Sequence, residues 1–255
     1  MAQKEAKSSI QVIERMMRLL AALGRHSSPV NLKQLATETK LHPSTAHRIL
    51  AVMVDHRLVD RIEPGTYRLG IRLLELGNVV KSRINVRQEA LAHMQSLHEE
   101  LGETVNLSVR NEDEVVYIER TSNSNAMMRV VQIIGARAPL HITAVGKLFL
   151  AEESPDKSAE YARRTGLPKF TENTFVDPES LVKELEKIRR QGYAFDNEEA
   201  EKGVSCIGAG IYNDEGRLVA GLSVSAPSDR LNRAWAAQVR QTAENISRAI
   251  GYRGQ

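Results

Sequence analysis

The chain has 255 residues, 42% of them apolar, which is enough for one large domain or two smaller ones with separate cores. Its longest apolar stretches, such as Leu148–Ala151, fall far short of the roughly 20 residues that a membrane span requires. The polar segment Met1–Ser9 lacks the apolar stretch of a secretion signal. A single cysteine, Cys206, excludes an internal disulfide, and no Cys/His cluster has the spacing of a structural zinc site. We therefore expect a cytoplasmic protein that contacts no membrane and needs no metal or cofactor.

The net charge of +3 is unevenly distributed along the chain. Residues 1–85 carry 14 Lys and Arg against 7 Asp and Glu, a net charge of +7, whereas residues 86–255 carry 21 against 25, a net charge of −4. A basic segment favours an acidic partner such as nucleic acid, although a basic surface without any partner has the same composition.

Helical patterns dominate the first third. A stripe of apolar residues at helical spacing predicts a helix that Gly24 ends; the stripe is Ile10, Ile13, Met17 and Leu20, widened by Val12, Met16, Leu19 and Leu23. Asn31, with Gln34 three residues later, is typical of a capping box and predicts a short helix that ends near Lys40. After a turn, Pro43 suits the first turn of a third helix, whose expected buried residues are Ala46, Ile49, Leu50 and Met53.

The third helix has the chemistry of a DNA recognition helix. Ser44, Thr45, His47 and Arg48 lie near its N-terminal end on the face opposite the apolar stripe. An arginine there can bond guanine O6 and N7, and the hydroxyl groups can bond bases or phosphates. Taken singly, however, such polar residues are also found on the solvated face of an ordinary three-helix bundle.

The pattern that follows predicts two short strands, which together would form a wing. Leu58–Ile62 and Thr66–Leu69 are joined by Glu63, Pro64 and Gly65, which suit a tight turn. We expect Arg61, Tyr67 and Arg68 on the wing surface, where they can contact phosphates. The order of these parts predicts a winged helix-turn-helix domain over residues 9–69. Its predicted DNA contacts are Lys33, Gln34, Ser44, Thr45, His47, Arg48, Arg61 and Arg68.

A linker helix and an α+β domain complete the chain. Residues 70–85 are apolar on more than one side of a predicted helix, which must pack against a partner subunit or against its own wing domain. Residues 86–252 predict an antiparallel sheet with flanking helices. The expected elements are a helix over Val86–Leu101, strands over Thr104–Arg110, Val115–Thr121, Met128–Ile134, Cys206–Tyr212 and Leu218–Ser225, and a closing helix over Leu231–Ile250.

The order of parts resembles the IclR family of bacterial transcription regulators, from Ser9 to Ile250. The resemblance is carried by LKQLATETKLHPSTAHRILAVMVDHRLVDR followed by YRLGIRLLELG, by GARAPLHITAVGKLFLA, and by GYAFDNEEAEKGVSCIGAGIYNDEGRLVAGLSVSAP. It implies a GAF-like effector domain, homodimers or homotetramers, and binding to a double-stranded DNA operator, as a repressor or an activator, that a small metabolite alters.

The resemblance also implies where the effector binds. The candidate residues are Met127, Val130, Ala144, Val145, Gly146, Asp196, Val204, Cys206, Ser223 and Ser225. Thr143 can cap a helix over Ala144–Ala151 and leave backbone N–H groups facing outward, which suits the carboxylate of an organic or aromatic acid. Ser223 and Ser225 can equally bond neighbouring strands, and Cys206 can be a buried apolar residue.

Two other functions fit parts of the sequence. A nonspecific nucleic-acid-binding protein would need only the basic first third. An enzyme could use Cys206 as a nucleophile with His141 as its base, although the nearest cation in sequence, Lys202, lies in an acidic stretch and does little to lower the pKa of the thiol.

Overall fold

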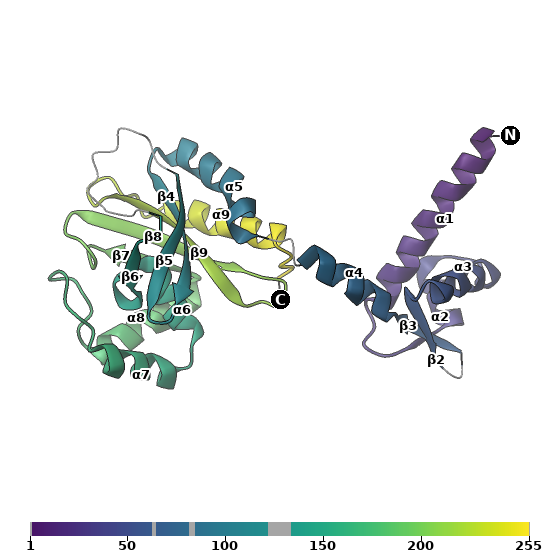
Figure 1. Cartoon of the computed structure of the whole chain (residues 1–255), viewed down its shortest axis with the longest axis horizontal. Coiled ribbons are helices and arrows are strands. Elements are labelled where there is room, and N and C mark those ends of the chain that lie inside the picture. Colours follow the sequence, from purple (N-terminus) through teal and green to yellow (C-terminus); the bar gives the residue numbers. More distant parts are fainter. Residues whose placement is uncertain (1, 63–64, 82–84, 122–133, 255) are drawn as a thin grey trace. The chain divides into compact units, whose positions relative to one another are not determined.

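The chain divides into two compact units, Met1–Ile84 and Asn85–Gln255. The structure is a computed structural model that describes residues 2–62, 65–81, 85–121 and 134–254, with side chains described from residue 11 onward except those of residues 80 and 81. Figure 1 shows the helices and strands of both units. Within the described ranges, no helix has both the length and the apolar character required to cross a membrane.

The N-terminal unit is a helical bundle with a small antiparallel sheet. Its sheet has the strand order β1-β3-β2, and its core gathers apolar side chains from the first three helices and the sheet. The elements are α1 (Ala2–Leu23), β1 (Val30–Asn31), α2 (Leu32–Thr39), α3 (Pro43–Asp55), β2 (Val59–Ile62), β3 (Thr66–Leu69) and α4 (Ile71–Lys81).

The second and third helices follow the sequence prediction closely. The Asn31 side chain accepts a hydrogen bond from the Gln34 backbone N–H at 2.9 Å, so the predicted cap of α2 is confirmed. Lys40 ends this helix in the left-handed conformation, with φ of 54°. The α3 residues predicted to be buried are all buried: Ala46, Ile49, Leu50 and Met53.

Three details of this unit differ from the prediction. α1 begins at Ala2, eight residues earlier than expected, and its buried residues are Leu19, Ala22 and Leu23, while Val12, Ile13 and Met17 are exposed. Tyr67 is buried and does not lie on the wing surface. The reason is the unpredicted strand β1, in which Val30 pairs with Tyr67 across the sheet and brings that ring into the core.

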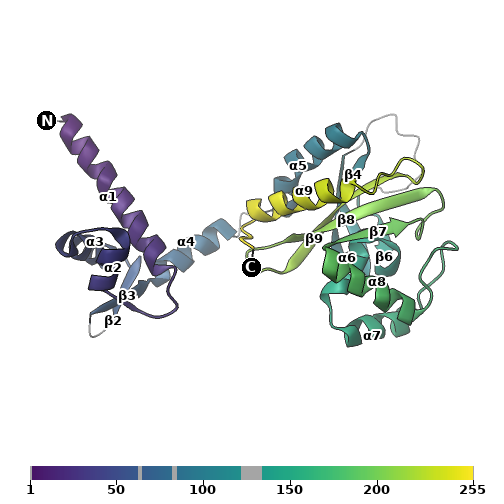
Figure 2. The ribbon, with the colours of Figure 1, turned by 180° about the vertical axis from the view of Figure 1, so that it is seen from behind.

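The C-terminal unit is a six-stranded antiparallel sheet between two helical layers. The strand order is β6-β5-β4-β9-β8-β7. Figures 1 and 2 show α5 and α9 on one face and α6, α7 and α8 on the other. The elements are α5 (Val86–Leu101), β4 (Thr104–Asn111), β5 (Glu114–Thr121), β6 (Arg137–Pro139), the 3₁₀ helix η1 (Leu140–Ile142), α6 (Ala144–Glu152), α7 (Pro155–Thr165), α8 (Pro178–Gln191), β7 (Tyr193–Asn197), β8 (Val204–Tyr212), β9 (Leu218–Pro227) and α9 (Trp235–Ala249).

Each face of this sheet has its own core. One cluster joins α5 and α9 to residues such as Leu107 and Ile207, and the other joins α6, α7 and α8 to Val115 and Cys206. Alternate residues of a strand point to opposite faces, so Cys206 and Ile207 enter different cores. The predicted antiparallel sheet with flanking helices is confirmed.

The element boundaries of this unit were predicted less well. The closing helix begins at Trp235 and not at Leu231, and β7 and the helices α7 and α8 were not predicted. The predicted strand Met128–Ile134 lies outside the described residues except for Ile134, which is in a turn.

The cap of α2 provides a test of how the helix-turn-helix is held. We expect Asn31→Ala to lower the free energy of unfolding by about 1 kcal/mol, because the first turn of α2 loses a side-chain acceptor. Asn31→Asp keeps that acceptor and should stay close to the parent protein. Urea unfolding followed by circular dichroism measures the difference, and equal destabilisation by both substitutions would contradict the role of the cap.

Candidate nucleic-acid interface and ligand cavity

The polar face of α3 lies on the surface of the N-terminal unit. Ser44, His47 and Arg48 are exposed, and Thr45 is half-buried. His42 caps the helix, and its Nδ1 lies 2.7 Å from the Ser44 hydroxyl. His42, Pro43 and Ser44 are all exposed, so the N-terminus of α3 lies at the surface, where N–H groups and the helix dipole favour a phosphate.

The other predicted DNA contacts are also on the surface, in different electrostatic settings. Lys33 and Gln34 are exposed on α2, and the Gln34 amide donates a hydrogen bond to Glu38 at 3.1 Å. Arg61 is exposed on β2. Arg68 is exposed on β3, but its guanidinium lies 3.2 Å from the Asp60 carboxylate, so a phosphate would compete with that ion pair.

A cavity of about 240 Å³ lies in the C-terminal unit. Six of the predicted effector-binding residues line it: Ala144, Val145, Asp196, Val204, Cys206 and Ser223. Thr143, also in the lining, accepts a hydrogen bond from the Gly146 N–H at 3.0 Å, so the predicted cap of α6 is present. The amides of Ala144 and Val145 belong to the first turn of α6, where N–H groups have no partner within a helix.

Two predicted residues lie beside the cavity and do not line it. A Cβ on Gly146 would come within 2.2 Å of the Leu140 carbonyl oxygen. Gly146 therefore faces the backbone of η1 and not the cavity. The Ser225 hydroxyl lies 3.1 Å from the Cys206 sulfur and 3.1 Å from the Asn106 amide nitrogen, within the sheet. Met127 and Val130 lie outside the described residues.

Several lining residues were not among the predicted binding residues. These are Tyr117, Ala136, Arg137, Ala138, Ala200 and Glu201, together with the helix cap Thr143. For Tyr117 a signal was present, because it lies two residues after Val115 on β5 and alternate residues of a strand point to the same face; both belong to the core that faces α6. The Arg137 guanidinium lies 3.1 Å from Glu114 and donates a hydrogen bond to Asn111.

Asp196 is the most strongly perturbed carboxyl group of the cavity. Asp196 is only 3% exposed, and one of its carboxylate oxygens accepts a hydrogen bond from the Glu199 backbone N–H at 2.7 Å. Burial, and then the nearby Glu199 carboxylate, raise the pKa of Asp196 to about 7, against the lowering effect of Lys147. At neutral pH this group therefore exists both as an acid and as a carboxylate.

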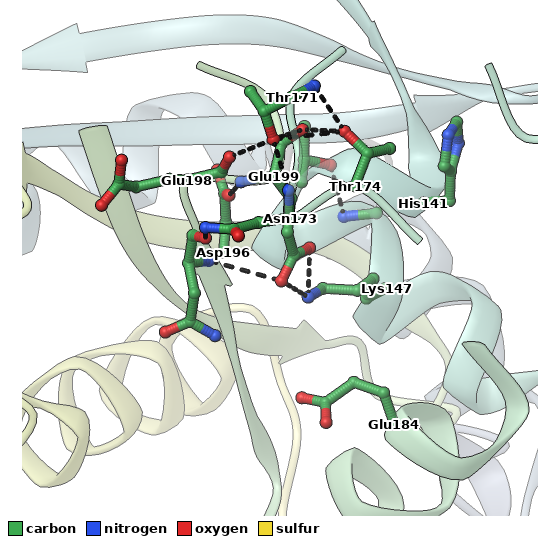
Figure 3. A network of polar contacts seen from close by, with 12 residues as sticks. His141, Lys147, Thr171, Asn173, Thr174, Glu184, Asp196, Glu198 and Glu199 are labelled. Carbon is green, nitrogen blue, oxygen red and sulfur yellow. Dashed lines mark hydrogen bonds and ion pairs between the residues drawn. The ribbon is translucent and has the colours of Figure 1, made fainter. Parts of the chain in front are cut away.

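Behind Asp196 lies a fully buried ion pair. The Lys147 ammonium of α6 donates to both oxygens of the Glu199 carboxylate, at 2.6 and 2.5 Å, and these two side chains are 0% and 3% exposed. Figure 3 shows the ammonium pointing directly at this carboxylate. Lys147 was not among the residues predicted from the sequence, because it lies within the apolar run AVGKLFLA.

The same network holds the segment that follows β7. The Thr171 hydroxyl donates to the Glu198 carbonyl at 2.6 Å, and the Thr174 hydroxyl donates to the Glu199 carbonyl at 2.7 Å. The Asn173 amide donates to the Asn197 carbonyl at 3.0 Å. Figure 3 shows these side chains above the ion pair. Both the backbone and the carboxylate of Glu199 are thus fixed, which positions Asp196 at the cavity.

The arrangement gives no support to a Cys206–His141 nucleophile and base. Burial, and then Asp196, raise the pKa of the Cys206 thiol well above its usual range, which disfavours the reactive thiolate. Both ring nitrogens of His141 have other partners, the Tyr161 hydroxyl at 3.0 Å and the Pro168 carbonyl at 3.1 Å. Among the residues that the structure describes, no group of three His, Cys, Asp or Glu side chains is placed to hold a metal ion.

A winged helix-turn-helix with an exposed recognition face, followed by a separate α/β unit, defines the class of DNA-binding transcriptional regulators. The family model for the IclR helix-turn-helix domain matches residues 12–63, and that for the bacterial transcriptional regulator IclR C-terminal domain matches residues 78–249. The chain belongs to the IclR family of bacterial transcriptional regulators.

Curated relatives and solved structures agree along nearly the whole chain. The chain is 33% identical to the Escherichia coli regulator XynR, over 95% of this chain and 98% of the relative. It is 32% identical to the Escherichia coli repressor AllR, over 98% and 94%. The Agobacterium tumefaciens repressor BlcR matches 97% of this chain and 100% of its own with a TM-score of 0.85 at 27% identity.

A further solved structure contains a ligand. It is an IclR homolog from Microbacterium hydrocarbonoxydans complexed with 4-hydroxybenzoate, which has a TM-score of 0.61 and 28% identity, covering 94% of this chain and 98% of that one.

The buried ion pair makes a prediction about stability. We expect Lys147→Met or Glu199→Met alone to lower the free energy of unfolding by about 3–5 kcal/mol, because each leaves a buried charged partner uncompensated. The double variant Lys147→Met/Glu199→Met removes both charges and should cost much less than the sum of the single changes. Denaturant unfolding of the four proteins measures the coupling, and strictly additive losses would contradict it.

Proposed function

We propose that this protein binds an operator sequence in double-stranded DNA and that a small carboxylic acid in the cavity of the C-terminal unit alters that binding. The observation that carries the proposal is the polar surface in the N-terminal half of α3, which lies on the side of the helix opposite its buried apolar residues. We assign base contacts to Ser44, Thr45, His47 and Arg48, and backbone contacts to Lys33, Gln34, Arg61 and Arg68.

The carboxylic acid is proposed from the lining of the cavity and from one relative. The cavity contains the first turn of α6, whose N–H groups suit an anion, and a set of hydroxyl, thiol and carboxyl groups from Ser223, Cys206 and Asp196. The homolog that was crystallised with 4-hydroxybenzoate supports a small organic acid as the effector. Met127 and Val130 remain predicted contacts.

We also propose that the protein works as a homodimer or homotetramer in the cytoplasm. Apolar side chains are exposed on two helices of the N-terminal unit: Val12, Ile13 and Met17 on α1, and Ile71, Leu74, Leu76 and Val79 on α4. Such surfaces commonly become buried between subunits. A two-fold dimer would present two recognition helices to a two-fold operator.

Arg48 tests the recognition helix. We expect Arg48→Ala to weaken binding to the operator by about 1–3 kcal/mol and to relax sequence preference, because a bidentate contact to guanine is lost. Arg163→Ala removes an equal charge from the exposed surface of α7 and serves as the control. Operator sequences are first selected from random duplexes, and fluorescence anisotropy then compares operator and scrambled DNA at one salt concentration.

Two outcomes would contradict this assignment. If the parent protein binds operator and scrambled duplexes equally at moderate salt, the protein is a nonspecific nucleic-acid binder. If Arg48→Ala and Arg163→Ala affect operator binding equally, Arg48 does not contact bases.

Asp196 tests the cavity. A thermal-shift screen with pyruvate, lactate, benzoate and 4-hydroxybenzoate should raise the melting temperature of the parent protein, because a ligand that binds only the native state stabilises it. At a hundredfold excess over Kd the gain is about 2.7 kcal/mol. Asp196→Ala should lose this shift and the response of operator binding to the acid, while it keeps operator affinity. An unchanged shift would place the effector elsewhere.

A further inference from the structure

Three ionisable groups, Lys147, Glu199 and Asp196, are buried together beside the cavity, and their charges would not balance if all three were ionised. The Lys147 ammonium donates to both oxygens of Glu199. Asp196 is a second buried carboxyl group, and its hydrogen-bond partners, the Glu199 backbone N–H and the Cys206 thiol, carry no full charge. If both carboxyl groups were ionised, the cluster would hold a net charge of −1 away from water, which is costly.

Among the residues that the structure describes, the groups around Asp196 offer it no cation that lacks a carboxylate partner. From β8, β5 and the segment after β7 it faces the Cys206 thiol, the Tyr117 phenol and the carboxyl groups of Glu199 and Glu201. Among the described groups around it the cations are Lys147 of α6 and Arg137 of β6. Each already has a carboxylate partner, Glu199 and Glu114 respectively.

An ionised Asp196 would also repel the effector proposed above. Two carboxylates that share a site of low polarity cannot both remain charged without a cation between them. A protonated carboxyl group, in contrast, donates a strong and short O–H···O hydrogen bond to a carboxylate. One oxygen of Asp196 accepts the Glu199 N–H, and the carboxyl group is also hydrogen-bonded to the Cys206 thiol, so we place the proton on the oxygen that does not accept the Glu199 N–H.

We propose that Asp196 selects a carboxylate effector by binding it as a neutral acid, which donates a hydrogen bond to the effector and takes up one proton from solution during binding. This inference rests on the proposed function, because it specifies how the same cavity recognises its ligand. Lys147 and Glu199 are positioning residues: because they pair with each other, Asp196 has no counter-ion of its own among the described residues, which keeps it available as an acid.

The charge state of the free protein sets the pH range of the effect. The pKa of Asp196 is raised to about 7 in the free protein, chiefly by burial. If the complex holds the protonated form, binding should take up about 0.9 proton at pH 8 and about 0.1 proton at pH 6. Affinity should then weaken roughly tenfold between pH 6 and pH 8, although carboxylic acids themselves remain ionised over this range.

Isothermal titration calorimetry of the full chain measures the proton directly. The probe is whichever of pyruvate, lactate, benzoate and 4-hydroxybenzoate gives the largest thermal shift. Titrations at pH 6 and pH 8, each in two buffers of different ionisation enthalpy, give the number of protons taken up. This measurement needs no variant, so the result does not depend on the folding of a mutant.

Asp196→Asn provides the matched variant. The asparagine amide keeps one acceptor for the Glu199 N–H and presents a permanent N–H donor to the effector. We expect this variant to bind the probe at pH 8 about as tightly as the parent binds it at pH 6, with no proton uptake. Glu184→Gln removes a carboxyl group from α8 that lies close to Glu199 and outside the cavity lining, and should leave the proton uptake unchanged.

The possible results distinguish a failure of the proposed acid sensor from a failure of the proposed protonation of Asp196. If no carboxylate binds the parent protein at either pH, the proposed acid sensor is wrong and this inference falls with it. If a carboxylate binds without proton uptake, and Asp196→Asn weakens binding more than tenfold, Asp196 acts as an ionised acceptor and only the inference is overturned. Loss of proton uptake in Glu184→Gln, with uptake intact in Asp196→Asn, would also overturn it.

Discussion

A lysine ammonium buried without any exposed surface constrains the whole region around the cavity of the C-terminal unit. Lys147 is carried by α6, which begins at the cavity, and Glu199 follows β7, which carries Asp196. Because the buried ammonium must keep its carboxylate partner, these two segments cannot separate without a large loss of stability. The hydroxyl groups of Thr171 and Thr174 hold the same segment through its backbone carbonyls. The cavity is therefore built into a rigid polar network.

The two units perform different chemistry because their functional groups lie in different environments. The candidate DNA contacts of the N-terminal unit are exposed, where water screens charges and long side chains can adapt to a phosphate backbone. The cavity groups of the C-terminal unit are buried, so that one proton on Asp196 decides whether an anion is attracted or repelled. Membership of the IclR family accounts for the combination of these two units in one chain.

The N-terminal unit could be predicted well because its signals are local. The buried face of α3 follows from the helical period, and the cap of α2 from Asn31 and Gln34. The prediction was wrong where a residue packs against a segment that is distant in sequence. Val30, in a strand of only two residues, pairs with Tyr67 and brings it into the core. The exposed residues Val12, Ile13 and Met17 of α1 show the same limit, since an apolar stripe predicts that a face will be covered and does not say by what.

For the cavity, the sequence and its family resemblance determined which segments take part: the capped start of α6, the strands that carry Asp196 and Cys206, and the strand that carries Ser223. Tertiary structure alone decided which side chains face the cavity, because Gly146 meets the η1 backbone and Ser225 is bonded within the sheet. It also decided the charge of the site. Lys147 and Glu199 are 52 residues apart, and the energy of a buried charge depends on which opposite charge the folded chain brings within contact distance and how much water it excludes.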